Sequence, residues 1–309
     1  MVDGESLEQR IRDIRGCLTA MVTPFDERSE VDTDGLRKNL RFQISNGIAG
    51  VVPLGTTGES PTVTEEEFKI IIGTAVDEAK GRVPVIAGAG SNSTEKTVHS
   101  AKMAEELGAD AVLIVTPYYN KPTQEGIYRH FEKVSSSTNL PIIVYNIASR
   151  SGVNIETRTL LRLSGLERVV GVKEASGSIS QIADVVGQMP RNFLVLSGDD
   201  GVTLPLISLG GHGVISVASN ILPKRVSDMV SSALGGDMQG ARRMNGELMP
   251  IFRDQFIETN PIPIKTAMRI LGMPSGGFRL PLCDMMPQNA ERLRKTLSMY
   301  SELKERMVV

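Results

Sequence analysis

The sequence predicts an α/β protein that folds as a (β/α)8 TIM barrel with a helical extension at its C-terminal end. Short apolar runs rich in β-branched residues recur eight times, with polar loops and helical segments between them. Each run is apolar almost throughout rather than alternating, which is typical of parallel strands buried on both faces. A repeating unit of about 25–35 residues suits a strand, a loop and a crossover helix, and eight such units make a barrel.

The strands are expected at eight places along the chain. In order, they are Leu18–Thr23, Gly50–Leu54, Val83–Ala87, Ala111–Val115, Ile142–Tyr145, Val169–Val172, Phe193–Leu196 and Gly213–Val217. A doubly wound open sheet is the alternative architecture. It would be favoured by a GxGxxG turn after a strand, but the nearest candidate, Gly88–Ser93, lacks the third glycine.

Amphipathic helices are predicted between the strands. The clearest are Thr64–Lys80, Ser93–Leu107, Thr123–Ser136 and Ile155–Leu163. Thr64 and Glu67 have the spacing of a capping box, and Gly108 is a helix stop. Beyond the eighth strand, helices are expected at Met238–Ile257, Pro263–Leu271 and Asn289–Arg306. We therefore expect two parts, a barrel over residues 1–236 that carries the site and a helical extension over residues 237–309.

Composition excludes several classes of protein. The 309 residues carry 34 Lys+Arg against 36 Asp+Glu, so no basic excess is present to neutralise nucleic-acid phosphates. Cys17 and Cys283 lie far apart and form no disulfide framework, which favours a reducing, cytoplasmic location. The N-terminal residues lack the apolar region of a signal peptide, and the longest apolar runs are too short to span a membrane. The three histidines do not pair at metal-ligand spacing, so no metal is expected.

A site in a barrel lies where the strands end and the following loops begin, and Lys173 occupies such a position. An amine that points into the barrel loses hydration, which can lower its pKa by up to ~3–5 units. The neutral amine is a nucleophile that forms a Schiff base with a carbonyl compound. A lysine that pairs with Glu174 or reaches the barrel rim is the alternative. Adjacent strand residues face opposite ways, however, so the pair with Glu174 has poor geometry.

Three further features lie at strand ends. Tyr145 ends the strand next to that of Lys173, where a phenol could exchange protons with an imine, although many such tyrosines are only core residues. Thr56 and Thr57 stand between two glycines, which indicates either a tight turn or a cradle for a small carboxylate. Arg150, on the loop after the fifth strand, is either a surface residue or a carboxylate clamp.

Other polar residues at strand ends are weaker candidates. Asp199 and Asp200 could bind a metal, but without further ligands nearby a loop or a helix N-cap is the better interpretation. His212 stands among glycines, which favours a turn. The glycine-rich loops after the seventh and eighth strands lack a lysine or arginine that would accompany a phosphate site.

Short motifs give the chain a family resemblance. They are GTTGES at 55–60, TPYYNKP at 116–122, YN…SR at 145–150, GVKEA at 171–175, LSGDD at 196–200, GGHGVISV at 210–217 and NPIPIK at 260–265. In this order and spacing, over nearly the whole chain, they resemble the dihydrodipicolinate synthase family. The resemblance implies a pyruvate-dependent lyase of the class I aldolase type. Such an enzyme condenses pyruvate with L-aspartate 4-semialdehyde to give 4-hydroxy-tetrahydrodipicolinate, in lysine and diaminopimelate biosynthesis.

The resemblance also implies a role for each matching residue. Lys173 matches the Schiff-base lysine, and Tyr145 matches the general acid and base. Thr56 matches the hydroxyl that relays the tyrosine's proton to Tyr119, which the family supplies from a neighbouring subunit. Thr57 matches a contact to the carboxylate of pyruvate.

The remaining matches concern the pocket and the assembly. Arg150 matches the residue at the pocket entrance that meets the carboxylate of the second substrate. Gly198 and Ile215 match backbone contacts that line the pocket. The family is usually a homotetramer built from two tight dimers, and it needs no metal or organic cofactor.

Two alternative functions remain open. A related pyruvate lyase would act on N-acetylneuraminate or a 2-keto-3-deoxy sugar acid, but N-acetylneuraminate lyases typically have GSTGE and lack the arginine at position 150. Thr56 together with Arg150 therefore favours the synthase. A barrel that only binds a keto acid would be expected to lack the lysine, the tyrosine or the threonine, and all three are present.

Two departures from the family pattern carry predictions. Ala148 stands where the family commonly has the proline of YNxPxR. The segment with Arg150 is therefore expected to be more mobile, and the specificity of the protein for its second substrate less defined. Lysine-inhibited members often carry histidines and a glutamate at positions that match Glu65, Phe68 and Lys96 here. Because a cation at Lys96 repels the ammonium groups of lysine, we expect weak feedback inhibition.

Overall fold

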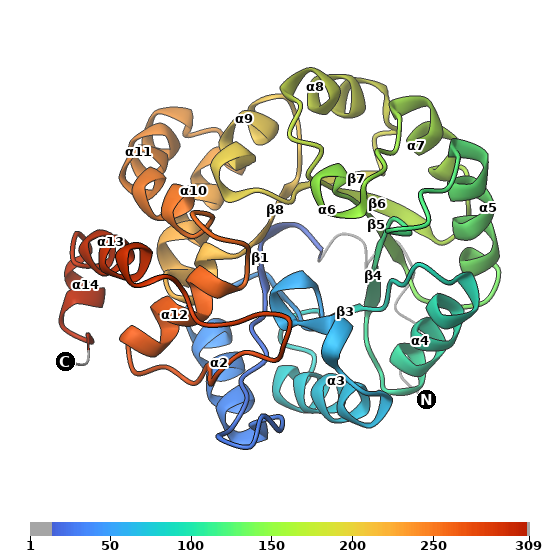
Figure 1. Cartoon of the computed structure of the whole chain (residues 1–309). Coiled ribbons are helices and arrows are strands. Elements are labelled where there is room, and N and C mark those ends of the chain that lie inside the picture. The colour runs from blue at the N-terminus through green and yellow to red at the C-terminus, as the bar shows by residue number, and fades with distance from the viewer. Residues whose placement is uncertain (1–13, 308–309) are drawn as a thin grey trace.

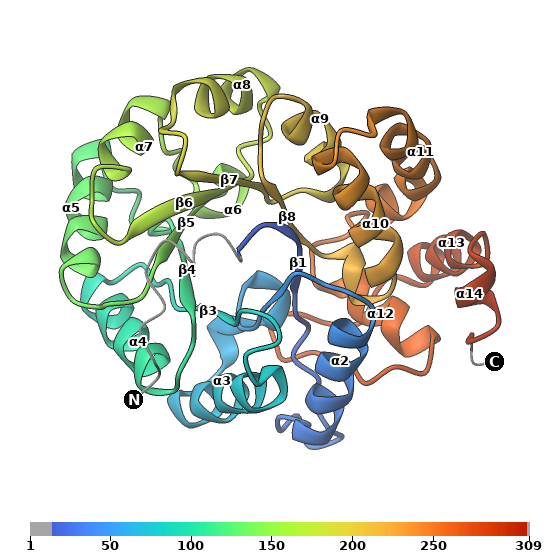
Figure 2. The same cartoon turned by 180° about the vertical axis from the view of Figure 1, so that it is seen from behind.

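The computed structural model describes residues 14–307 as a barrel of parallel strands. The eight strands pair in the order β2-β1-β8-β7-β6-β5-β4-β3. A parallel bridge between Val51 and Val85 brings β2 and β3, the two ends of this sheet, together. Helices surround the strands in Figure 1, and the same ring is seen from behind in Figure 2. The predicted (β/α)8 architecture is confirmed.

The strands fall close to the predicted segments. They are β1 (Gly16–Ala20), β2 (Gly50–Val52), β3 (Ile86–Gly88), β4 (Ala111–Val115), β5 (Ile142–Asn146), β6 (Val169–Glu174), β7 (Leu194–Ser197) and β8 (Gly213–Ser216). The first strand ends earlier than predicted, although the apolar run continues. There the backbone N–H of Val22 donates to the side chain of Asn220 rather than to a neighbouring strand.

The helices of the barrel follow the strands in turn. They are α2 (Thr33–Ser45), α3 (Glu65–Ala79), α4 (Thr94–Glu106), α5 (Gln124–Ser135), α7 (Thr157–Leu163), α8 (Ile179–Gln188), α9 (Thr203–Ser208) and α10 (Pro223–Leu234). The predicted capping box of Thr64 and Glu67 begins α3. Gly108 follows α4 with a φ of +83°, which suits a helix stop. Short helical turns, including α6 (Ala148–Ser151), occupy the loops at the carboxyl ends of the strands.

After α10, the described part of the chain ends in four helices on one side of the barrel (Figures 1 and 2). They are α11 (Met238–Asp254), α12 (Ile262–Ile270), α13 (Pro287–Leu297) and α14 (Ser301–Lys304). The expectation of one helix over Asn289–Arg306 was wrong. The helix breaks before Tyr300, whose buried side chain turns inward and donates to the backbone oxygen of Glu247 in α11.

Side-chain alternation divides the core into two layers. One set of residues fills the barrel interior, including Leu18, Ile143 and Ile215, and the other set packs between the strands and the helices. Cys17 belongs to the outer layer, and both cysteines are free. Within residues 14–307, no helix is long and apolar enough to cross a membrane.

Candidate active site

A β-bulge turns Lys173 into the barrel. The register between β5 and β6 shifts by one residue here. Ile142 pairs with Val169, whereas Ile143 pairs with Gly171. Val170 lies in the inner layer and Val172 in the outer layer, which strict alternation would not allow. The extra residue thus reverses the alternation, and Lys173 faces inward.

The Lys173 amine lies against Tyr145 on the neighbouring strand. The two residues are register partners, and Nζ of Lys173 is 4.2 Å from the centre of the tyrosine ring. Each residue is only 5% exposed. Loss of hydration lowers the pKa of Lys173 to about 7 and raises the pKa of Tyr145 to about 12. Near neutral pH about half of the amines are therefore neutral, and the phenol keeps its proton.

Neighbouring charges adjust both pKa values. Asp200 raises the pKa of Lys173, opposing the effect of burial, and Arg150 lowers it. Arg150, together with hydrogen bonding between the Thr56 and Tyr145 side chains, lowers the pKa of Tyr145. Glu174 faces away from the amine and accepts hydrogen bonds from Asn146 at 3.1 Å and from the backbone of Ser176 at 2.7 Å.

Gly198 leaves room for the side chain of Lys173. A Cβ at this position would lie 3.1 Å from Cε and 3.2 Å from Cγ of Lys173, so a side chain would press on the lysine stem. The backbone N–H of Gly198 donates to the oxygen of Glu174 at 2.8 Å. Ile215 lies in β8, facing the barrel interior. Both predicted pocket residues thus border the interior that holds Lys173.

Thr56 and Thr57 occupy a tight helical turn directly after β2. The chain turns at Leu54, whose φ is +58°, and its carbonyl oxygen would lie 1.9 Å from a Cβ at position 88, where the sequence has glycine. Thr57 is buried, and its Oγ1 accepts from the side-chain amide of Asn260 at 3.0 Å. The hydroxyl hydrogen of Thr57 is therefore left to serve another acceptor.

Arg150 lies in the loop after β5, as predicted, where the chain forms the short helix α6. Its Nη2 donates to the backbone oxygen of Asn260 at 3.0 Å. Ala148 is the first residue of this helix, a position where a proline is also tolerated. Asn260 therefore contacts both Thr57 and Arg150.

Tyr119 does not enter the interior of its own barrel. Its side chain is 88% exposed and its φ is +74°, an unusual backbone conformation for a tyrosine. The backbone N–H of Tyr119 donates to the oxygen of Ser151 at 3.4 Å. Tyr119 and Arg150 line the same surface hollow. The structure thus places Tyr119 outside the interior that holds the Lys173–Tyr145 pair of its own chain.

The two aspartates after β7 have different surroundings. Asp199 caps a helical turn by accepting from the backbone of Gly201, as the sequence suggested. Asp200 instead is buried, and its Oδ2 accepts from Gln255 at 2.7 Å and from the backbone of Val217 and Ala218 at 3.0 Å each. Sequence reasoning weighed Asp200 only as a metal ligand or a cap and missed these contacts, because its partners come from the residues that directly follow β8 and α11.

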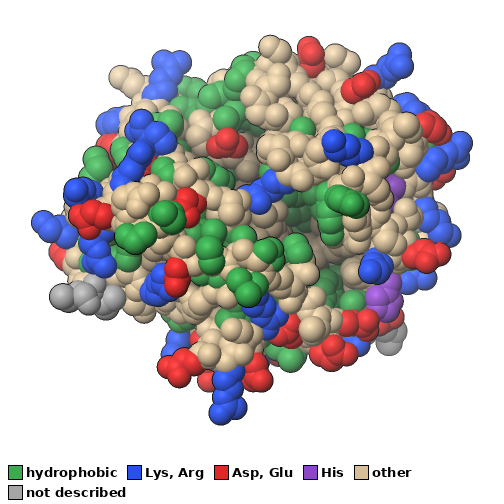
Figure 3. All heavy atoms as spheres, in the orientation of Figure 1, with side chains coloured by type: hydrophobic (Ala, Val, Ile, Leu, Met, Phe, Trp, Pro, Cys, Tyr) green, Lys and Arg blue, Asp and Glu red, His purple; other side chains and the backbone are tan. Residues whose placement is uncertain are grey.

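A cavity of about 730 Å³ opens beside these residues. Thr56, Arg150 and Asn260 are in its wall, and Lys173 and Tyr145 are not, in keeping with their depth. Figure 3, in the same view as Figure 1, shows this face of the molecule hollowed near its centre. Among residues 14–307, no three His, Cys, Asp or Glu side chains gather where they could hold a metal ion.

The geometry supplies a deep amine with a lowered pKa, a protonated phenol, hydroxyl groups at a tight turn and a cation at the entrance. A (β/α)8 barrel with these groups has the features of an aldolase-type enzyme that forms a Schiff base with its substrate. A model of the dihydrodipicolinate synthetase family matches residues 13–300. The chain belongs to this family.

Individual relatives agree with this assignment. A 4-hydroxy-tetrahydrodipicolinate synthase from Methanocaldococcus jannaschii is 50% identical over 284 residues, which cover 92% of this chain and 97% of the relative. The crystal structure of dihydrodipicolinate synthase from Aquifex aeolicus is 44% identical, with a TM-score of 0.92 and coverage of 96% of this chain and 100% of that one. A monomeric dihydrodipicolinate synthase variant is 43% identical, with a TM-score of 0.91 and coverage of 94% and 97%.

Proposed function

We propose that this chain condenses pyruvate with L-aspartate 4-semialdehyde, through a Schiff base on Lys173, to give 4-hydroxy-tetrahydrodipicolinate in lysine and diaminopimelate biosynthesis. The observation that carries the proposal is the buried Lys173 amine, with a pKa lowered to about 7, at 4.2 Å from the ring of Tyr145. Relatives at about 50% identity that are named for this synthase support the choice of substrates.

In the first half of the reaction, the neutral amine of Lys173 attacks the keto carbon of pyruvate. Tyr145 then donates a proton to the former keto oxygen, which leaves as water, and an imine remains. The phenolate left on Tyr145 then accepts a methyl proton, which turns the imine into an enamine. The hydroxyl of Thr57, which already accepts from Asn260, donates to the carboxylate of pyruvate.

In the second half, the enamine carbon attacks the aldehyde carbon of aspartate semialdehyde. The amino group of that substrate then attacks the imine carbon, closes the ring and releases the amine of Lys173. Thr56 passes protons between Tyr145 and Tyr119, and Arg150 binds the carboxylate of the second substrate at the entrance. Its hydrogen bond to the backbone of Asn260 supports Arg150 in that position.

Tyr119 acts in a neighbouring subunit, which makes the working protein at least a dimer and, by family resemblance, a cytoplasmic homotetramer. The 88% exposure of Tyr119 supports this proposal, since the side chain is free to reach another copy. Residues 1–236 would then form the catalytic barrel and residues 237–309 an extension. Mixing Tyr119→Phe and Lys173→Ala subunits should restore activity, and failure of the mixture would argue against a shared site.

The function is tested by offering purified protein pyruvate with aspartate semialdehyde and, separately, N-acetylneuraminate. We expect pyruvate-dependent consumption of aspartate semialdehyde, absent from Lys173→Ala. Cleavage of N-acetylneuraminate without consumption of aspartate semialdehyde would move the protein to the related lyases. Binding of pyruvate without turnover of either substrate would leave only a keto-acid-binding barrel.

A further inference from the structure

A second buried lysine, Lys265 in α12, has no role in the proposed reaction. Its side chain is 0% exposed, and Nζ donates to Oε1 of Glu59 and to the backbone oxygen of Gly277, each at 2.6 Å. The rings of Phe25 and Phe278 lie 4.4 Å and 5.3 Å from the amine. Protein therefore encloses the amine, and no substrate can reach it.

Its partner Glu59 directly follows the turn that carries Thr56 and Thr57. Glu59 has a φ of +53°, and its backbone N–H donates to the oxygen of Thr56 at 3.2 Å. The second carboxylate oxygen of Glu59 accepts from the backbone of Arg279 at 3.2 Å. Both carboxylate oxygens of Glu59 thus accept hydrogen bonds from the C-terminal part of the chain.

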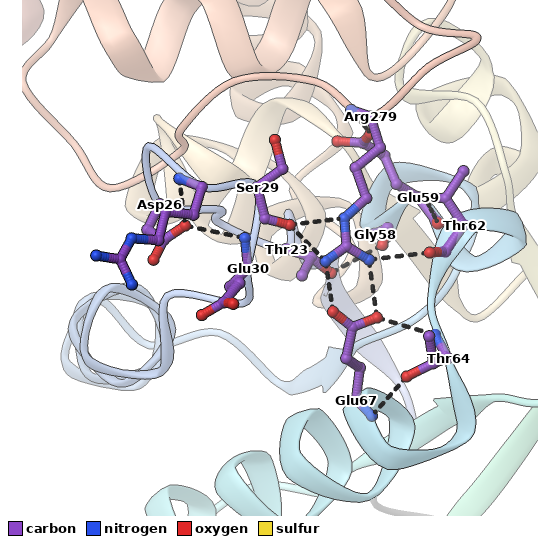
Figure 4. Close-up of polar contacts among 11 residues, drawn as sticks. Thr23, Asp26, Ser29, Glu30, Gly58, Glu59, Thr62, Thr64, Glu67 and Arg279 are labelled. Atoms are coloured by element: carbon purple, nitrogen blue, oxygen red, sulfur yellow. Dashed lines mark hydrogen bonds and ion pairs between the residues drawn. The ribbon is translucent and has the colours of Figure 1, made fainter.

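Arg279 holds the far side of the same turn, as Figure 4 shows. Its guanidinium group forms an ion pair with Glu67 at the start of α3 and donates to the backbone oxygens of Ser29 and Thr62. Gly58, inside the turn, accepts from the hydroxyl of Thr23 at 2.8 Å. Both residues are drawn in Figure 4. The turn is therefore fixed on both sides of Glu59.

The same C-terminal segment also reaches the substrate side of the turn. Asn260 precedes Lys265 by five residues, just before α12 begins, and donates to Thr57 Oγ1 at 3.0 Å. Displacement of the segment around Lys265 would therefore move a partner of Thr57 as well as the backbone next to Thr56.

We propose that Glu59 and Lys265 are positioning residues, which hold Thr56 against Tyr145 and Thr57 against the carboxylate of pyruvate. The inference rests on the proposed function, because that function gives the two threonines their tasks. Stability alone is a weak reason for such a pair, since replacing a buried ion pair by apolar residues is often neutral or stabilising. Precise placement is a stronger reason, because misplacement by about 1 Å can lower a rate by ~10²-fold.

The test compares Glu59→Gln, Lys265→Met and the apolar double variant Glu59→Met/Lys265→Met with wild type. Glu78→Gln is the matched control, because Glu78 is a buried carboxylate that pairs with Arg37 and Arg41, between α2 and α3 and away from the turn. Two quantities are measured. One is the melting temperature, and the other is the pyruvate concentration that half-saturates borohydride trapping on Lys173.

We expect each single variant to raise the half-saturating pyruvate concentration by about tenfold or more, and the double variant to raise it by less than the product of the single effects. The control should lower the melting temperature and leave that concentration unchanged. A half-saturating concentration equal to wild type in the variants that fold would overturn the proposal. The double variant keeps the test decisive if the single variants do not fold, because it leaves no buried charge unpaired.

Trapping requires only pyruvate, so the readout is independent of the second substrate. If wild type traps pyruvate but does not consume aspartate semialdehyde, the proposed function fails while the positioning proposal is still measured. Unchanged half-saturation in the variants, with full consumption of aspartate semialdehyde by wild type, would overturn the positioning proposal alone.

Discussion

Lys173 and Tyr145 are register partners on β6 and β5, and the lysine amine lies 4.2 Å from the centre of the tyrosine ring. The phenol is thereby held beside the atom that would form an imine. Burial moves the two pKa values apart, to about 7 and about 12, so the base and the acid exist together near neutral pH. This arrangement suits an amine that attacks and a phenol that donates a proton.

Tyr145→Phe should lower kcat by about 10²–10⁴-fold, the usual contribution of a positioned general acid or base. Because the lysine remains buried, the variant should still form a borohydride-trappable adduct with pyruvate, though more slowly. Steady-state rates and the trapping rate are compared with wild type. Near-wild-type turnover would show that Tyr145 is only a core residue.

The rate of adduct formation at low pyruvate should rise with pH, with its midpoint near pH 7, and level off at higher pH, where Lys173 has lost its proton. The sign follows from the chemistry, since the protonated amine that prevails at lower pH is not a nucleophile. The rate of borohydride trapping is measured across this range. A midpoint near the ordinary lysine pKa of about 10.4 would contradict the lowered value.

Gly171→Ala should disturb the bulge that turns Lys173 inward. A Cβ at this position would lie 2.7 Å from Cβ and 2.8 Å from the backbone oxygen of Leu194. We expect a loss of about 1–3 kcal/mol in the free energy of unfolding, measured with urea, and reduced turnover. Gly187→Ala in α8 is the control, because a Cβ there meets nothing within 4 Å and alanine favours a helix. Equal stability of the two variants would contradict the account of the bulge.

Lysine should inhibit the enzyme only weakly, even at millimolar concentration. Lys96 lines the cavity beside the site, and Glu65 in the same wall is engaged with Lys69 at 3.0 Å and His99 at 3.1 Å. A ligand with two ammonium groups meets a cation where a carboxylate would attract it. Initial rates are measured with increasing lysine, and Lys96→Glu should become more sensitive. Sub-millimolar inhibition of wild type would contradict this prediction.

Local patterns predicted the fold well, because continuous apolar runs and helix caps are properties of short segments. β4 falls on the predicted residues Ala111–Val115, and the capping box at Thr64 is present. Local patterns did not predict where long elements break. The break before Tyr300 depends on a contact with Glu247 in another helix, which a periodicity count does not contain.

The candidate site likewise has residues that the sequence predicted and residues that it did not. Lys173 and Tyr145 lie near the ends of their strands and Thr56 follows another strand. The barrel geometry brings strand ends together, so their grouping could be predicted. The role of Asn260 could not be predicted in this way, because its partner Thr57 lies 203 residues away in the sequence. The inward direction of Lys173 depends on the bulge, and no residue type signals a bulge unambiguously.

The most direct test of the central claim is the location of the trapped pyruvate. The protein is incubated with pyruvate and borohydride, digested, and the modified peptide is identified by mass spectrometry. The account predicts one adduct, on the peptide that contains Lys173, and none in Lys173→Ala. An adduct on another lysine, or no adduct in wild type, would contradict the assignment of Lys173 as the nucleophile.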